Sequence, residues 1–245
     1  MRIGDAYGEM LLAALDSDDE ILEIVERDDG SIMASRFGPA YYLAPYPKWP
    51  GRQRRALRFA RGRVLDVGAG GGRVPLHFQQ KGNDVVAIDA SPGTIEACRR
   101  RGVGDARVMR VEDVDASLGV FDTVVMYGNN LGLLASPTKA PRILRRLARI
   151  TSERARIIAE GTDPYSTDDP GHLAYHERNR QRGRMGGQLR IRIRFREIAS
   201  PWFEYLFLSR RELEEILDGT GWRLARMIED DGPTYVAVIE KTRGS

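Results

Sequence analysis

The fold is decided at residues 64–73, which read VLDVGAGGGR. A short apolar run typical of a buried strand leads into glycines at 68, 70 and 72, and a helical pattern follows to about Gln80. Glycine permits a tight turn and lets a ligand approach the backbone, while a helix N-terminus offers free N–H groups. Arg73 stands where a dinucleotide fingerprint needs its third glycine, and no Gly-Lys-Ser/Thr phosphate loop is present.

Outward from this stretch, short apolar runs alternate with helical segments. Strands are expected at 84–88, 106–111, 121–127 and 155–160, with a helix at about 138–150, and two further runs at 222–229 and 234–240 form a closing pair. This order predicts an α/β fold: a doubly wound, mostly parallel seven-stranded sheet with helices on both faces and an antiparallel terminal strand pair.

Two segments depart from this rhythm. Before the core, an amphipathic helix at 7–15 precedes a capping box at 17–20, which predicts a second helix carrying Ile21, Ile24 and Val25. Residues 162–208 contain a predicted short helix at 172–181 and a hairpin of 189–195 with 201–208, turning near 199–200. We therefore expect a single domain over 1–245: an N-terminal helical cap at 1–60, a core at 61–161 and 209–241, and an inserted helix–hairpin at 162–208 over the acceptor cleft.

A carboxylate ends the second core strand. Asp89 lies 21 residues after Gly68, and an acid there can accept hydrogen bonds from both hydroxyls of a ribose. The glycine loop and this acid together predict a ribosyl ligand on a doubly wound sheet.

The ordered elements resemble the class I S-adenosylmethionine-dependent methyltransferases. They are Asp66 with the glycines, Asp89, the triplet 112–114 and FDTVVMYGNN at 121–130. The resemblance implies S-adenosyl-L-methionine as cofactor and S-adenosyl-L-homocysteine as product. It assigns cofactor binding to Asp66, Gly68, Ala69, Gly70, Gly72, Asp89, Ala90, Glu112, Asp113, Val114, Tyr127, Gly128 and Asn129. Met109 and Arg110 replace a Gly-Asp that many members carry, which leaves open whether Glu112 or Asp113 accepts from adenine.

Methyl transfer is an in-line displacement that needs alignment, exclusion of water and, for a protonated acceptor, a base. Tyr127 and Asn129 follow the fourth strand at the expected reaction centre, and His172 or His176 is a candidate base. The two histidines are four apart, but a metal site would need a third ligand, so no metal is expected.

Acceptor contacts are expected from aromatic residues before the core, from the loop after the fourth strand and from the arginine-bearing strand. The candidates are Tyr41, Tyr42, Tyr46, Asn130, Arg190 and Arg192. Packing of the cap, a polar turn and a solvated strand edge are the alternative explanations. If the arginines line the cleft, the acceptor is a small anionic metabolite.

The amino-acid composition limits which other kinds of protein this chain could be. The single cysteine excludes a disulfide framework, and we find neither a signal-peptide pattern nor a run of about 20 apolar residues, so a cytoplasmic protein without a membrane partner is expected. Basic stretches at 48–63 and 178–196 keep an RNA methyltransferase as an alternative, although no RNA-binding module is evident. A catalytically silent cofactor-binding module is the other alternative. The expected partner is a small-molecule acceptor, and the expected assembly is a monomer or homodimer.

Overall fold

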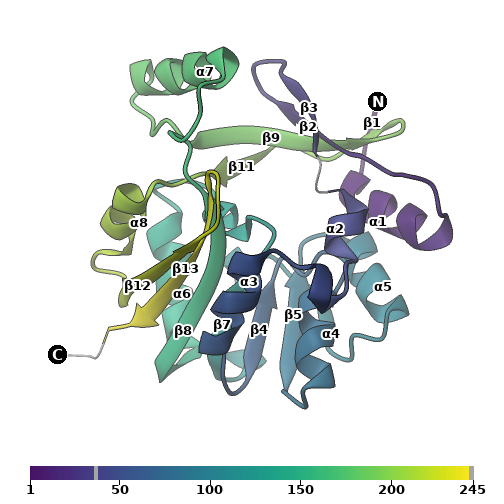
Figure 1. Cartoon of the computed structure of the whole chain (residues 1–245), viewed down its shortest axis with the longest axis vertical. Helices are drawn as coiled ribbons and strands as arrows, with labels where there is room; N and C mark the ends of the chain where they lie inside the picture. Colours follow the sequence, from purple (N-terminus) through teal and green to yellow (C-terminus); the bar gives the residue numbers. More distant parts are fainter. Residues whose placement is uncertain (36–37, 243–245) are drawn as a thin grey trace.

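The strand that precedes the glycine loop lies inside a seven-stranded sheet. The computed structural model describes residues 1–35 and 38–242, and in that part of the chain the sheet has the order β12-β13-β8-β7-β4-β5-β6 (Figure 1). Strands β4 to β8 are parallel and the β12–β13 pair is antiparallel. The bounds are β4 Val64–Val67, β5 Val85–Asp89, β6 Ala106–Val108, β7 Phe121–Met126, β8 Thr151–Thr162, β12 Trp222–Glu229 and β13 Thr234–Lys241. The predicted fold class is confirmed.

Helices cover both faces of this sheet because successive strand residues point to opposite sides. On β7, Val124 packs in a cluster with residues of α6 and α8, whereas the adjacent Val125 packs in a cluster with residues of α3 and α4. The helices are α3 Gly51–Ala56, α4 Arg73–Gln80, α5 Pro92–Arg100, α6 Ala140–Arg149 and α8 Arg210–Leu217. Short 3-10 turns occupy η1 Tyr46–Lys48, η2 Leu57–Phe59, η3 Val111–Asp113, η4 Ala116–Leu118 and η5 Asn130–Leu134.

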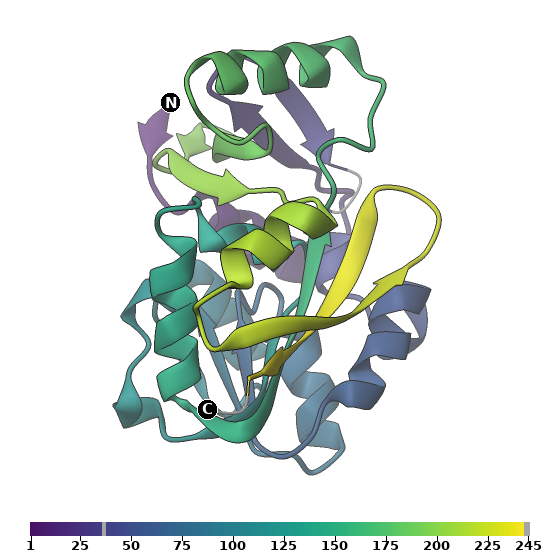
Figure 2. The same cartoon turned by 90° about the vertical axis from the view of Figure 1, so that its left-hand side faces the viewer.

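A second sheet lies above the carboxyl ends of the parallel strands (Figures 1 and 2). Its order is β1-β10-β9-β2-β3, with β11 also paired to β9. The strands are β1 Arg2–Ile3, β2 Glu23–Arg27, β3 Ile32–Ser35, β9 Gln188–Phe195, β10 Ile198–Ala199 and β11 Phe203–Leu206. Helices α1 Ala6–Asp16, α2 Pro39–Tyr42 and α7 Pro170–Gln181 accompany it. The N-terminal segment and the predicted insertion therefore build one structure together.

Two local predictions are wrong. Residues expected to form a second N-terminal helix form strand β2, because Ile24 and Val25 pair with β9 and β3 and tertiary pairing overrides the local capping signal. The hairpin of β9 with β11 is present, but the chain reverses at Arg196 and Glu197, between β9 and β10, rather than near 199–200. Arg196 has a φ of 51° there.

The two faces of the second sheet have opposite character. Cross-strand partners share a face, so the pair Glu26–Arg192 lies on one side and the pair Val25–Ile193 on the other. On the first side the arginines have partners. Arg192 and Arg194 form ion pairs with Glu26, at 2.8 and 3.5 Å, and Arg192 also lies over the ring of Trp202. The apolar side is the one turned toward the seven-stranded sheet, because it carries Glu23, whose carboxylate accepts from the lid residue Tyr42.

The buried core predicts a test of the sheet packing. Phe121 is fully buried at the start of β7, whereas its neighbour Val120 is 60% exposed. We expect Phe121→Ala to lower the free energy of unfolding by about 3–5 kcal/mol, since it removes a ring and leaves a cavity. Val120→Ala is the matched control and should change it by less than about 0.5 kcal/mol. Urea unfolding measures both, and equal effects of the two substitutions would contradict the assigned packing.

Candidate functional site

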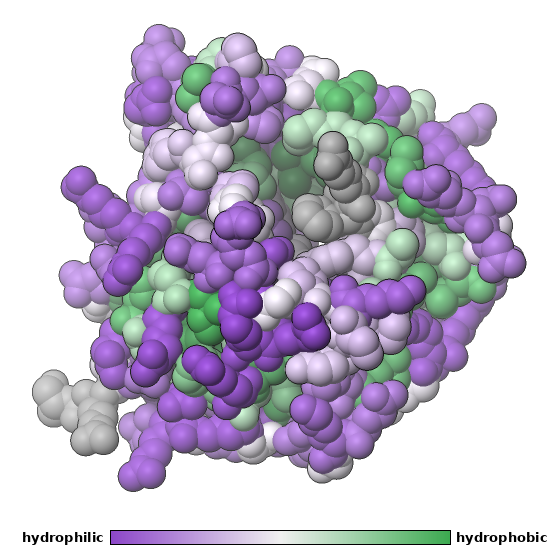
Figure 3. All heavy atoms as spheres, in the orientation of Figure 1, coloured by the Kyte–Doolittle hydropathy of each residue, from purple (hydrophilic) through white to green (hydrophobic). Residues whose placement is uncertain are grey.

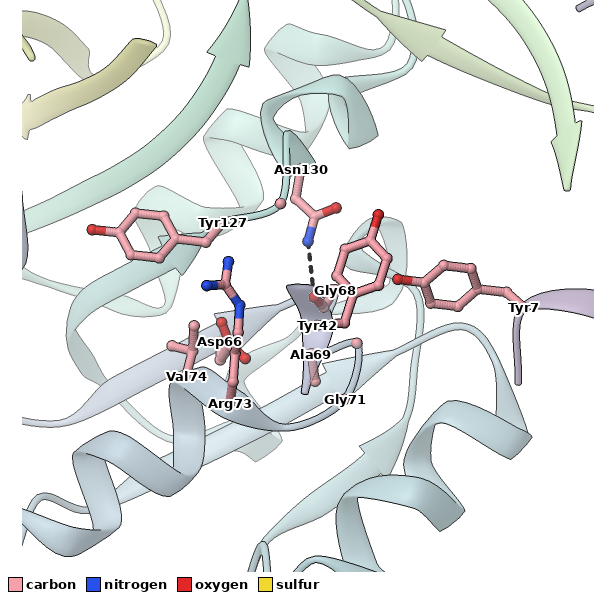
Figure 4. Close-up of a pocket in the computed structure, with 12 residues that line it drawn as sticks. Tyr7, Tyr42, Asp66, Gly68, Ala69, Gly71, Arg73, Val74, Tyr127 and Asn130 are labelled. Carbon is pink, nitrogen blue, oxygen red and sulfur yellow. Dashed lines mark hydrogen bonds between the residues drawn. The ribbon is translucent and has the colours of Figure 1, made fainter. Parts of the chain in front are cut away.

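The glycine loop, residues 68–72, joins β4 to α4 and forms the floor of a pocket (Figure 4). Gly68, Gly70 and Gly72 all have positive φ values, 73°, 53° and 74°. A Cβ atom on Gly68 would lie 2.3 Å from the side-chain nitrogen of Asn130, so the loop requires glycine there for both conformation and space. The loop thus presents bare backbone to whatever the pocket holds.

Asp89 stands beside this loop at the end of β5. Its carboxylate accepts from the backbone N–H groups of Gly70, at 3.3 Å, and Ser91, at 2.9 Å. Burial raises the pKa of the Asp89 carboxyl to about 6, against the opposing effect of these hydrogen bonds. Asp89 therefore lies next to the glycine loop, where the sequence placed a ribose-binding acid.

The β7 loop, residues 127–130, forms the opposite wall. Asn130 donates from Nδ2 to the carbonyls of Val67 and Gly68, at 3.1 and 2.8 Å, and so ties this loop to the glycine loop. The hydroxyl of Thr162 donates to Oδ1 of Asn129, and the hydroxyl of Tyr127 donates to the carbonyl of Gln53. Asn129 and Tyr127 shape the wall with their backbone, while their side chains are engaged elsewhere.

A buried carboxylate organises this wall. Glu160, at the end of β8, is 1% exposed, and its Oε2 accepts from the backbone N–H groups of Gly128 and Asn129, at 2.8 and 3.2 Å. The same oxygen accepts from Gln53 at 2.7 Å, while Oε1 lies 2.7 Å from the guanidinium of Arg52. Glu160 therefore joins β8, the β7 loop and α3.

Helix α2 closes over the pocket as a lid. The ring of Tyr42 is the nearest group, at 3.5 Å, to a Cβ placed on Gly128, and Tyr42 lines the pocket together with Tyr7. Arg101, at the end of α5, donates to the carbonyls of Leu43 and Gly71, which fastens the lid to the glycine loop. Burial raises the pKa of Tyr42 well above its ordinary value, so this phenol stays protonated. It donates to Oε2 of Glu23 at 3.1 Å.

Two buried ionisable side chains in the pocket have open hydrogen-bonding atoms. Asp66 is 2% exposed and Arg73 is 6% exposed. Within residues 1–35 and 38–242, neither Oδ2 of Asp66 nor Nη1 and Nη2 of Arg73 has a hydrogen-bond partner. Burial raises the pKa of the Asp66 carboxyl to about 8, and Arg73 opposes this shift.

The predicted adenine-side residues follow β6 at the same edge of the sheet. Glu112 forms ion pairs with Arg110, at 3.0 Å, and Lys139, at 3.9 Å, whereas Asp113 is exposed and Val114 is buried. Ala90 is exposed beside Asp89. None of these four lines the pocket at the glycine loop, and their roles stay predictions.

Several predicted site residues lie elsewhere. His172 and His176 are on α7, which Figure 1 places at the far end of the second sheet. His176 is buried against Tyr165, and burial lowers its pKa. Among the described residues, no group of three His, Cys, Asp or Glu side chains could hold a metal ion. The two histidines therefore lie apart from the pocket, and neither is proposed as the general base.

Some of the residues predicted to contact the acceptor lie at the pocket, and the others lie elsewhere. Tyr42 and Asn130 line the pocket, and Tyr41 lies behind them with its hydroxyl 3.3 Å from Glu160. Tyr46 stacks on His77 at 4.2 Å, outside the pocket lining, so it packs the cap onto the core. Arg190 and Arg192 lie on the outer face of the second sheet, so neither enters the acceptor site proposed below.

Sequence reasoning missed four residues of the site. Glu160 had a signal, because it lies near the carboxyl end of a strand of the parallel sheet, as Asp89 does. For Arg73, the sequence shows only that it stands in place of the third glycine of a dinucleotide fingerprint. No sequence pattern around Tyr7 or Glu23 pointed to the site. Their elements, α1 and β2, are far from the glycine loop along the chain and come close to it only in the folded structure.

The role of Glu160 can be tested by removing its charge. Glu160→Gln should lower the free energy of unfolding by about 3 kcal/mol, because it leaves the nearly buried Arg52 without its closest anion. Glu153→Gln, at an exposed position on the same strand, is the control. Urea unfolding of both variants provides the comparison, and an unchanged midpoint for Glu160→Gln would contradict the organising role.

The raised pKa of Asp66 predicts a pH dependence. Between about pH 4 and pH 8 the folded protein holds a proton at Asp66 that the unfolded chain has released, so this group's contribution to stability is lost as the pH rises through about 8. Relative to Asp66→Asn, the wild type should lose about 5 kcal/mol of unfolding free energy across this range, at about 1.4 kcal/mol for each pH unit. Urea titrations at several pH values measure the difference between the two proteins, and a constant difference would exclude a protonated Asp66.

Known proteins match both the core and the whole fold. Residues 64–154 match a family described as a methyltransferase domain. A curated relative, a ubiquinone biosynthesis O-methyltransferase of Xanthomonas oryzae pv. oryzae, is 36% identical over 99 residues. That match covers 38% of this chain and 41% of the relative, so the chain spans about two fifths of the length of the curated relatives it matches.

The structural matches extend over more of the chain. A SAM-dependent methyltransferase from Bacteroides fragilis in complex with S-adenosyl-L-homocysteine has a TM-score of 0.81 at 24% identity, covering 97% of this chain and 95% of that one. The Burkholderia thailandensis 1,6-didemethyltoxoflavin-N1-methyltransferase has a TM-score of 0.52 at 19% identity, covering 78% and 79%. Residues 64–154 thus match the methyltransferase domain family, and the ordered glycine loop, strand-end acid and terminal strand pair give the chain the fold of the SAM-dependent methyltransferases.

Proposed function

We propose that this chain transfers a methyl group from S-adenosylmethionine to a hydroxyl of a small molecule. The observation that carries the proposal is a pocket between the glycine loop and the β7 loop at the carboxyl edge of a parallel sheet, with Asp89 hydrogen-bonded to Gly70 of the glycine loop. The oxygen acceptor is taken from the curated relatives, which are named as ubiquinone biosynthesis O-methyltransferases.

The residues of the pocket fit this cofactor. The bare glycine backbone gives close approach, Asp89 beside the glycine loop supplies acceptors for ribose hydroxyls, and the open atoms of Asp66 and Arg73 call for a polar ligand. The bound cofactor would supply a methyl group already activated by a positive sulfur. The chain then has to align the acceptor and exclude water, and the α2 lid, fastened by Arg101, supports the second task.

The acceptor site is proposed between the β7 loop and the second sheet. Figure 3 shows a hollow between the upper and lower parts of the molecule with hydrophobic surface at its depth. The inner face of the second sheet carries Ile191 and Ile193 toward this side, and Tyr205 donates from its hydroxyl to the carbonyl of Asn129 at 2.6 Å. Glu23 and Tyr42 are the polar pair there, next to which we place the acceptor because a hydroxyl must lose its proton during transfer.

An anionic acceptor is not part of the proposal. The expectation rested on Arg190 and Arg192, and Arg192 already has Glu26 as a bidentate partner at 2.8 and 2.9 Å.

Many arginines of the two basic stretches, 48–63 and 178–196, form ion pairs with acidic side chains. Fewer of them are therefore free to bind RNA phosphates, which weakens the RNA methyltransferase alternative. These pairs include Arg52–Glu160, Arg55–Asp230, Arg63–Asp84, Arg178–Asp28 and Arg192–Glu26. No helix among the described residues is long and apolar enough to span a bilayer.

Ligand binding tests the proposal. S-adenosylhomocysteine at about 100 times its dissociation constant should raise the unfolding midpoint by about 5–10 °C, and NAD should not raise it. Asp89→Ala should abolish most of the shift, because the ribose loses its acceptor. Asp84→Ala, an exposed carboxylate just before the same strand, is the control. Stabilisation by NAD alone, or an unchanged shift in Asp89→Ala, would reject the assigned site.

The same preparation tests the reaction. Isotopically labelled methyl groups should pass from the cofactor to members of a panel of small hydroxylated aromatic compounds. Label recovered in RNA would favour the RNA methyltransferase instead, and retention of all label on the cofactor with every acceptor would favour the silent module.

A further inference from the structure

The side chain of Tyr42 connects the pocket to the second sheet. Its ring lies along both loops of the pocket, because a Cβ placed on Gly70 or Gly128 would be 3.8 or 3.5 Å from it. The hydroxyl of Tyr42 points away from the glycine loop (Figure 4) and donates to Oε2 of Glu23, on β2, at 3.1 Å. The phenol therefore stands between the glycine loop and the hollow in which we place the acceptor.

Glu23 is a buried carboxylate on the inner face of the second sheet. It is 6% exposed, and its charge adds to the effect of burial in raising the pKa values of Tyr7 and Tyr205. The rings of Tyr7 and Tyr41 pack edge-on against Tyr42, with centroids 5.6 and 5.5 Å from that of Tyr42. The charge of this one carboxylate thus acts on several neighbouring phenols.

The phenol of Tyr42 holds its proton firmly when the site is at rest. Burial and then the charge of Glu23 raise the pKa of Tyr42 well above its ordinary value, so Tyr42 is not a preformed phenolate base. Its oxygen can still accept a hydrogen bond from a second hydroxyl while its own proton points to Glu23. Such an arrangement can pass a proton along two adjacent hydrogen bonds without forming a charged phenol.

Methyl transfer to a hydroxyl releases a proton that some group has to take up. Both histidines considered as a base lie on α7, apart from the pocket. Glu160 is already paired with Arg52 at 2.7 Å. Glu23, in contrast, is hydrogen-bonded to a hydroxyl whose residue, Tyr42, lines the pocket.

We propose that Tyr42 takes the proton of the acceptor hydroxyl as it passes its own proton to Glu23. This inference rests on the proposed function, which supplies the methyl donor. The acceptor oxygen forms a bond to the methyl carbon, the carbon–sulfur bond breaks, and its electron pair stays on sulfur. The hydroxyl proton moves to Tyr42 and the phenol proton to Glu23, which leaves a neutral phenol and a neutral carboxyl group. The acceptor class that needs this relay is a hydroxyl that is not ionised near neutral pH.

Two phenols of different acidity test the relay. Para-nitrophenol ionises in mildly alkaline buffer without a base, whereas para-cresol is about as weakly acidic as tyrosine. Tyr42→Phe and Glu23→Gln should each lower kcat for para-cresol about 100-fold, but kcat for para-nitrophenol less than about threefold, because an ionised acceptor has no proton to lose. Tyr46→Phe and Glu26→Gln are matched controls that should leave both rates unchanged. Tyr46 packs outside the pocket lining, and Glu26 lies on the outer face of the second sheet.

Binding without turnover gives an independent readout. In the complex with S-adenosylhomocysteine no methyl group can move, so calorimetry reports only the contacts of the acceptor. Para-cresol should bind to Tyr42→Phe about fivefold more weakly than to the wild type, because one hydrogen bond to the acceptor hydroxyl is lost. Equal affinities would show that Tyr42 does not touch the acceptor, and the relay would be wrong.

The other outcomes separate the relay from the proposed function. Equal losses of kcat with both phenols would give Tyr42 and Glu23 a structural role only and overturn the relay. A loss in Glu23→Gln without one in Tyr42→Phe would overturn it in favour of direct transfer to Glu23. A wild type that binds S-adenosylhomocysteine but methylates neither phenol would reject the hydroxyl acceptor and the relay together, and a folded wild type that does not bind it would reject the proposed function itself. Unfolding midpoints of all variants separate loss of activity from loss of folding.

Discussion

The hydrogen bonds of the Glu160 carboxylate hold the pocket wall in place. Two backbone N–H groups of the β7 loop, the side chain of Gln53 and the guanidinium of Arg52 all converge on a side chain that is 2% exposed. A charge that is this buried is tolerated only with a full set of partners, so the β7 loop and α3 have little freedom to move independently. Asn130 then carries the same constraint to the glycine loop through its bonds to Val67 and Gly68.

The second sheet lies above the pocket (Figure 1) and carries Glu23, which accepts a hydrogen bond from Tyr42 of the lid. It is assembled from segments at opposite ends of the chain's core: β1 to β3 come before it, and β9 to β11 come from the insertion. The alternation along β9 directs its arginines outward to Glu26 and Trp202, and directs Ile191 and Ile193 inward. An Arg-rich strand thus presents an apolar surface toward the seven-stranded sheet.

The polar side chains that hold the site together differ in their hydrogen bonding from two that line the pocket. Asp89, Glu160 and Asn130 all have short hydrogen bonds to the backbone, whereas Asp66 and Arg73 keep open atoms that face the pocket. Unmade hydrogen bonds in a buried place raise the free energy of the ligand-free protein, and a complementary ligand recovers that energy on binding. Rigid surroundings and open hydrogen-bonding atoms together suit recognition of a polar small molecule.

The sequence by itself determined the seven-stranded sheet, the glycine loop and Asp89, because these depend on hydrophobic periodicity and on glycine spacing within a few residues. It also predicted the hairpin of β9 with β11. It failed at β2, where a capping box suggested a helix, and at the arginines of β9, whose orientation depends on what packs against the sheet. Glu160 lies near the end of a strand, a pattern that the sequence does show, but Glu23, Tyr7 and Arg73 acquired their places in the site only from tertiary structure. Their partners lie far away along the chain, and contacts of that kind leave no local pattern to detect.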